Sequence, residues 1–166
     1  MNTALEDILM SFNKEGMISY MNSHPDEYEE AVGLAVKDKQ PFSWRAAWLL
    51  WSCMEENDPR IKGHLKTIID CIEGKSDGHK RELIKILLMM ELSEEQEGLV
   101  FDICMNAWEK VNSAPSVRHT AFKMILRIAK KYPELQNDIV FITQDHYLDS
   151  LSPGIRSSVI RMLNEE

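Results

Sequence analysis

Residues 115–129 read PSVRHTAFKMILRIA, and this stretch decides the fold. Counted from Pro115 as position zero, apolar residues stand at positions +6, +7, +9 and +10, which lie on one side of an α-helix. The same four positions are apolar in the stretches that start at Pro41, Asp77 and Pro153. The steps between the four starting residues are 36, 38 and 38 residues. A period in this range is typical of stacked pairs of helices.

The starting residues suit the beginning of a helix. Proline is favoured in the first turn, where the missing N–H would have no partner, and aspartate favours the positive end of the helix dipole. Elsewhere, Thr3 with Glu6 and Ser93 with Gln96 form capping-box patterns, which predict two further helix starts. The apolar spacing also predicts one helix over residues 134–148.

The sequence therefore predicts an all-α fold. The longest strand-like run is Val140–Thr143, and it fits better within a helix. The period predicts a right-handed α-α superhelix, or solenoid, of about four helix pairs. We expect a single domain over residues 1–166. Within it, residues 41–166 would form regular repeats, and residues 1–40, which follow the period only loosely, would form an N-terminal capping repeat.

The starting residue, a nearby arginine and the apolar pattern resemble the second helix of a HEAT or armadillo-like repeat. Arg118 and Arg156 stand at +3, where that pattern places its arginine, whereas Arg45 and Arg81 stand at +4. The resemblance covers roughly residues 41–166. It implies a helical repeat fold in which the second helices line a concave surface, and it implies no particular activity.

Composition narrows the class of protein. The net charge is −8, and residues 1–40 hold eight acidic and three basic side chains, which opposes binding to nucleic acid. No apolar stretch is long enough to span a membrane, and the N-terminus lacks the pattern of a secretory signal. Cys53, Cys71 and Cys104 are widely spaced in helical patterns, so we expect them to be reduced and buried. These features predict a cytoplasmic protein without membrane contact.

No sequence pattern points to catalysis or metal binding. None of the five histidines has another histidine four residues away, and none lies near a paired-cysteine motif. The chain also lacks a nucleophile-elbow motif and a glycine-rich phosphate-binding loop. We therefore expect no catalytic residue, no metal site and no cofactor.

Trp44, Trp48 and Trp51 form the most unusual cluster in the chain. Their spacing places them on one side of one helix. Trp48 and Trp51 occupy the repeat positions +7 and +10, so we expect them to be buried in the core. Trp44 stands at +3, at the expected edge of the core, and is a candidate exposed aromatic anchor for a partner.

Basic residues on the repeat helices form a second candidate site. Lys85, Lys123 and Arg161 all stand at +8 in their copies, and Arg127 follows Lys123 on the same helix face. Stacked repeats would align these residues into a binding row, with Trp44 as a possible apolar anchor. Two alternatives remain: an ordinary solvated helix face, or a row that pairs with acids of residues 1–40 in a homodimer.

The sequence thus predicts a non-enzymatic protein-interaction or scaffold module. It would bind a partner of unknown identity, for which an acidic protein is one option, on the concave face through Trp44, Lys85, Lys123, Arg127 and Arg161. One alternative is a nucleic-acid binder similar to the HEAT-like DNA glycosylases, whose basic cleft the acidic composition opposes. Another is a structural subunit that associates with itself.

Overall fold

The computed structural model describes residues 1–11 and 13–165, and within these ranges it contains helices and no strand. The predicted all-α class is therefore confirmed. The chain divides into two compact units, Met1–Leu92 and Ser93–Glu166. The helices of the first unit are α1 (Ala4–Leu9), α2 (Lys14–Ser23), α3 (Tyr28–Ala35), α4 (Phe42–Cys53), α5 (Pro59–Lys62), α6 (Leu65–Cys71) and α7 (Asp77–Leu88). Those of the second unit are α8 (Glu94–Glu109), α9 (Pro115–Ala129), α10 (Gln136–Ile142), α11 (Asp145–Leu148) and α12 (Pro153–Asn164).

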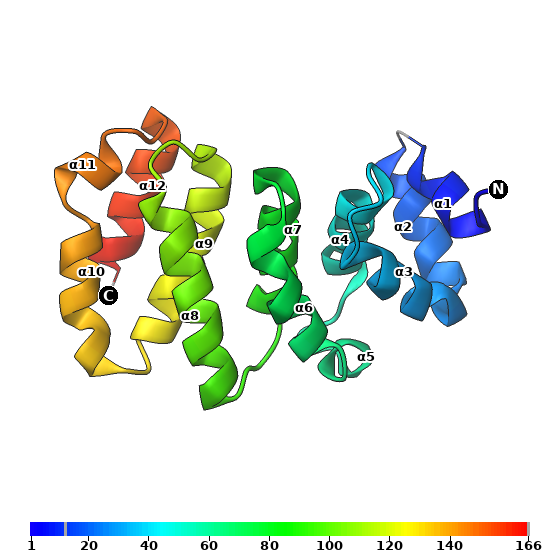
Figure 1. The fold of residues 1–166 in the computed structure, drawn as a ribbon, viewed down its shortest axis with the longest axis horizontal. Helices are drawn as coiled ribbons and strands as arrows, with labels where there is room; N and C mark the ends of the chain where they lie inside the picture. Colours follow the sequence, from blue (N-terminus) through cyan, green and yellow to red (C-terminus); the bar gives the residue numbers. More distant parts are fainter. Residues whose placement is uncertain (12, 166) are drawn as a thin grey trace. The chain divides into compact units, whose positions relative to one another are not determined.

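Helix α4 is the centre of the first unit. It packs against α3 on one side and α7 on another, and α2 also contacts it (Figure 1). Its small residues Ala46 and Ala47 are fully buried, as are Leu49 and Leu50. Small side chains let neighbouring helices approach closely, while the leucines supply most of the buried apolar area. The arrangement gives α4 one fully buried side and leaves another side for its larger aromatic residues.

Helices α8 and α9 form the closest pair in the second unit, and α9 also packs against α10 and α12 (Figure 1). Trp108 of α8 lies fully buried, with its ring centre 4.6 Å from that of Phe122 on α9. Its indole N–H donates to the carbonyl oxygen of Ile142 at 2.8 Å. Trp108 therefore ties α8, α9 and α10 together at the core of this unit.

The predicted helix starts are confirmed. Helices α7, α9 and α12 begin at Asp77, Pro115 and Pro153, and α4 begins one residue after Pro41. Both predicted capping boxes close with reciprocal hydrogen bonds, at Thr3 and at Ser93. The sequence signals for helix starts are thus local, and they agree with the tertiary structure.

The predicted apolar stripe is fully buried on α7 and α9 but only partly on the other two repeat helices. On α12, Val159 is buried whereas Ile160 is 41% exposed. On α4, Trp48 and Trp51 are half-buried, so the expectation that both lie in the core was wrong. Repeat position alone does not decide burial, because burial also depends on what the neighbouring helix offers opposite each residue.

Two further expectations need correction. The helix predicted over residues 134–148 is interrupted at Thr143, whose hydroxyl donates to the carbonyl oxygen of Ile139 at 2.7 Å before Gln144 adopts an extended conformation. Such a side-chain bond offers the backbone an alternative to continuing the helix. Of the three cysteines, all of them free thiols, Cys104 is buried as expected, but Cys53 and Cys71 are only half-buried.

Candidate functional site

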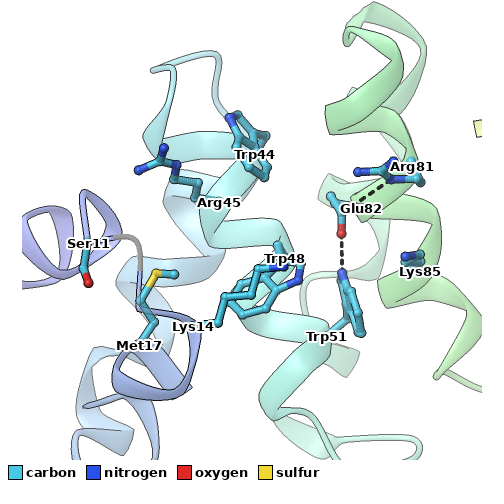
Figure 2. Close-up of a pocket in the computed structure, with 10 residues that line it drawn as sticks. All are labelled: Ser11, Lys14, Met17, Trp44, Arg45, Trp48, Trp51, Arg81, Glu82 and Lys85. Atoms are coloured by element: carbon cyan, nitrogen blue, oxygen red, sulfur yellow. Dashed lines mark hydrogen bonds and ion pairs between the residues drawn. The ribbon is translucent and has the colours of Figure 1, made fainter. Parts of the chain in front are cut away.

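A pocket of about 540 Å³ lies within the first unit, between helices α2, α4 and α7 (Figure 2). We call it the tryptophan pocket, because three of the four tryptophans in the chain line it. Its lining residues are Ser11, Lys14, Met17, Trp44, Arg45, Trp48, Trp51, Arg81, Glu82 and Lys85. Its volume lies in the range of pockets that bind small ligands or single side chains of a partner.

Helix α4 supplies the aromatic wall. Trp44, Trp48 and Trp51 are spaced four and three residues apart, so their side chains lie on one side of the helix. The rings of Trp48 and Trp51 meet edge to face, with centres 6.2 Å apart and planes at 76°. This is a favourable geometry for two aromatic rings. Trp44 is 38% exposed, as predicted for an aromatic residue at the edge of the core.

Helix α7 supplies the buried carboxylate of Glu82, which is 1% exposed. One carboxylate oxygen accepts a hydrogen bond from the indole nitrogen of Trp51, and the other accepts from Nε of Arg81 at 2.9 Å (Figure 2). A buried carboxylate is expensive unless charged or polar donors surround it. Glu82 therefore fixes Trp51 against α7 and holds Arg81 at the pocket.

Two lysines extend over the aromatic wall. The ammonium of Lys85 lies 4.6 Å from the ring centre of Trp51, and that of Lys14 lies 5.4 Å from the ring centre of Trp48. These are cation–π distances. Among residues 1–11 and 13–165, neither lysine makes an ion pair. Their charges therefore stay available to an incoming anion.

The pocket is electropositive in a chain that is acidic as a whole. Lys14, Arg45, Arg81 and Lys85 face a single lining carboxylate, Glu82, while the net charge of the chain is −8. The guanidinium of Arg45 lies 5.5 Å from the ring centre of Trp44 and also donates to the carbonyl oxygen of Leu9 at 2.7 Å. The local excess of cations attracts anionic groups to this surface.

A chain of hydrogen bonds supports the first turn of α4 beside Trp44. The amide oxygen of Gln40 accepts from the backbone N–H of Trp44 at 3.1 Å, and its amide nitrogen donates to Nδ1 of His79 at 3.1 Å. Nε2 of His79 then donates to the carbonyl oxygen of Ala35 at 2.6 Å. Burial lowers the pKa of His79, which favours the neutral imidazole that this arrangement requires.

The second unit carries the other predicted cations, Lys123, Arg127 and Arg161. Lys123 and Arg161 are exposed and Arg127 is half-buried. Helices α9 and α12 are in contact, and Nε2 of His119 lies 3.0 Å from the hydroxyl oxygen of Ser158. Because Lys123 follows His119 by one helical turn and Arg161 follows Ser158 by three residues, both cations lie just beyond this contact. We call these three residues the basic row of the second unit.

The predicted row of Lys85 with Lys123 and Arg161 spans both units, and it stays a prediction. Lys85 and Trp44, in contrast, meet at the same pocket of the first unit.

Lys131, a further cation of the second unit that follows helix α9, does not belong to the basic row. Its Nζ lies 2.9 Å from the carboxylate of Glu97, so its charge is partly neutralised.

The arginines of the repeat pattern occupy two different environments. Arg118, at +3, is fully buried and donates to the carbonyl oxygens of Trp108 and Tyr147, at 2.8 and 2.7 Å. Arg45 and Arg81, at +4, line the tryptophan pocket instead. One residue of slip rotates a helical side chain by about 100°. The register difference was visible in the sequence and marked the two arginines that belong to the pocket.

Neither metal coordination nor membrane spanning is indicated by the described residues. Within residues 1–11 and 13–165, no group of three or more His, Cys, Asp or Glu side chains is placed to hold a metal ion. None of the helices described is both long and apolar enough to cross a membrane.

Comparison with known families identifies the repeat. The family model of the HEAT repeat domain matches the chain over residues 1–166, so the chain belongs to this family. Neither the curated proteins nor the solved structures provided a match. The resemblance seen at residues 41–166 thus extends over the whole chain.

Proposed function

We propose that this HEAT repeat protein is a non-enzymatic interaction module that binds a protein partner on its concave face. HEAT repeats are generally protein-interaction scaffolds, which supports binding as the function. The tryptophan pocket is the observation that carries the proposal. It combines tryptophan and arginine, the residue types most often found at the energetic centres of protein interfaces.

The pocket favours binding over catalysis. Glu82 is the one carboxylate among its lining residues, and each of its oxygens already accepts a hydrogen bond, from Trp51 and from Arg81. A general base must instead reach a proton of the substrate. The acidic composition of the chain also disfavours a nucleic-acid polymer as the ligand. Such a polymer carries a row of phosphates, which requires cations along an extended path.

We further propose that the helices form one domain, in which about four helix pairs stack as a right-handed superhelix capped by residues 1–40. The repeat steps of 36, 38 and 38 residues support this arrangement. In such a stack, Lys85, Lys123 and Arg161 would align along the concave surface, and Arg127 would extend the row. The partner would then contact both the tryptophan pocket and the basic row of the second unit.

Partner capture with charge-reversed variants tests this function. The wild-type protein is immobilised, retained proteins are identified by mass spectrometry, and one purified partner is titrated against Lys123→Glu with Arg161→Glu. The matched control, Lys62→Glu with Lys110→Glu, changes the same charge at two other exposed lysines. We expect the first pair to weaken capture at least about tenfold and the control to retain it.

Several results would count against the proposal. Equal capture by both variants would remove the basic row from the binding surface. A DNA mobility shift at low salt, lost in the first variant only, would favour the nucleic-acid alternative. Light scattering that shows a stable dimer broken by the same variant would favour self-association.

A further inference from the structure

We infer that the tryptophan pocket recognises an acidic peptide segment in which an aromatic residue stands between carboxylates. The inference rests on the proposed partner binding and specifies the chemistry of the segment that enters this pocket. It is carried by three observations, namely two cations without carboxylate partners, an open aromatic wall, and supports that hold this wall in place before any ligand arrives.

The two lysines define where the carboxylates bind. The ammonium of Lys14 lies 5.4 Å from the ring centre of Trp48, and that of Lys85 lies 4.6 Å from the ring centre of Trp51. Each of these two rings therefore has one cation above it. Neither makes an ion pair within the described residues. A peptide carboxylate beside each ammonium completes a charge pair without displacing an existing one. Arginine or lysine side chains of a partner would instead meet like charge.

The wall defines what lies between the carboxylates. Trp44, Trp48 and Trp51, with Met17 opposite them, provide a mostly apolar surface (Figure 2). The volume of about 540 Å³ accommodates one large side chain and its adjoining backbone, and a folded element would not enter. Aromatic rings favour edge or offset contacts with other rings. An aromatic residue therefore fits the wall better than a charged or small residue.

The wall is held by groups that the ligand does not need to move. Glu82 accepts the hydrogen bond of the Trp51 indole, and Gln40 accepts the backbone N–H of Trp44 at 3.1 Å. His79 in turn orients Gln40 from helix α7. Preorganised side chains lose little conformational freedom on binding, which favours a short segment that has few contacts to offer.

The charge distribution favours a short acidic segment over a phosphate polymer. Four cations line the pocket, whereas residues 1–40 carry eight acidic and three basic side chains. A polymer with one charge per unit needs cations along an extended path, which the net charge of −8 opposes outside the pocket. A segment with its carboxylates confined to the pocket keeps its charges beside Lys14 and Lys85.

Tryptophan fluorescence of the full chain provides the readout, because three of the four tryptophans line the pocket and Trp108 is fully buried elsewhere. The probe is the blocked peptide Glu-Glu-Phe-Glu-Glu. Control probes replace the central Phe with Ala or all Glu with Lys. We expect a saturable change in fluorescence with the first probe, at least about tenfold weaker binding of the Ala probe, and no saturation with the Lys probe. Raising the salt concentration should weaken binding of the first probe.

A variant pair tests the assigned lysines. Lys14→Glu with Lys85→Glu should weaken the affinity for the Phe probe at least about tenfold. The control, Lys37→Glu with Lys62→Glu, makes an equal charge change at two exposed lysines and should keep the affinity within about twofold of wild type. Circular dichroism confirms that both variants are folded. The probe series on the wild-type chain tests the inference independently of either variant.

Three results would overturn the inference: equal binding of the Glu and Lys probes, equal weakening by both variant pairs, or tighter binding of adenosine monophosphate than of the Phe probe. Failure here is separable from failure of the proposed function. If the probe does not bind while partner capture still depends on Lys123 and Arg161, only the inference fails. If partner capture also shows no dependence on Lys123 and Arg161, the proposed function fails as well.

Discussion

The carboxylate of Glu82 on helix α7 accepts a hydrogen bond from the indole nitrogen of Trp51 on helix α4. Glu82 is 1% exposed, so this hydrogen bond is shielded from water on the side of its acceptor. Glu82→Leu should lower the free energy of unfolding by about 1–3 kcal/mol, because it removes the acceptor of both the Trp51 indole and Nε of Arg81. Urea unfolding followed by circular dichroism measures the change. Glu82→Gln keeps an acceptor for the indole and should lose less free energy of unfolding. An equal loss in both variants would show that the hydrogen bond is not the cause.

Arg118 and Arg156 occupy the same repeat position but have different expected contributions to stability. Arg118 is fully buried, and its guanidinium lies 4.5 Å from the ring centre of Trp108. Arg118→Ala leaves the carbonyl oxygens of Trp108 and Tyr147 without this donor and should cost about 3–5 kcal/mol. Arg156 is 45% exposed and lies 3.6 Å from Asp149, so Arg156→Ala should change stability by less than about 1 kcal/mol. Thermal unfolding of both variants distinguishes the two, and similar shifts would contradict the assignment.

Asp58 should make the protein sensitive to strong acid. The hydrogen bonds from the side chain of Arg60, with Nη2 at 2.7 Å, and those from backbone N–H groups lower the pKa of this buried carboxyl to about 2. The ordinary pKa of an aspartate is higher, so the unfolded chain binds its proton first as the pH falls. The stabilisation is complete above about pH 4 and is lost as the pH falls through about 2, with a size of ~2 kcal/mol.

Urea unfolding between pH 5 and pH 2 measures this contribution. Asp58→Asn is the matched control, because asparagine still caps helix α5 but has no titrating carboxyl. Its stability should fall less steeply over this interval. Parallel curves for the two proteins would show that Asp58 does not carry the acid sensitivity.

His79 should give a second, milder dependence on pH. It is 1% exposed, and burial lowers its pKa. The hydrogen bond with the carbonyl oxygen of Ala35 opposes this shift, as do Asp38 and Glu82, whereas Lys75 adds to it. The unfolded chain therefore takes up a proton near the ordinary histidine pKa of about 6.5, before the folded protein does. Stability should decrease as the pH falls below that value. His79→Gln should flatten the dependence between pH 7 and pH 5, and an unchanged slope would exclude His79 as its source.

Helix positions were largely predictable because their signals are local. Pro115, Pro153 and Asp77 begin the helices that the sequence assigned to them, and the caps at Thr3 and Ser93 form as expected. These signals depend on the first turn of a helix and on its own side chains. They require no knowledge of the neighbouring helix.

The candidate site was predictable only in part. Trp44 and Lys85 stood out because the repeat core did not account for them, and both line the pocket. Trp48 and Trp51 follow the core pattern but line the pocket, where Trp51 contacts Glu82 and Lys85. A periodic pattern does not reveal these contacts. Lys14 comes from α2, outside the regular repeats, so its approach to Trp48 depends on tertiary packing alone.

Helix α8, the first helix of the second unit, begins immediately after its own capping box at Ser93, the first residue of that unit. The side chains that close this start, Ser93 and Gln96, both lie within the unit. The hydrogen bonds that cap the start of this helix therefore involve no residue of 1–92. During translation, this cap can form as soon as the first turn of α8 has left the ribosome.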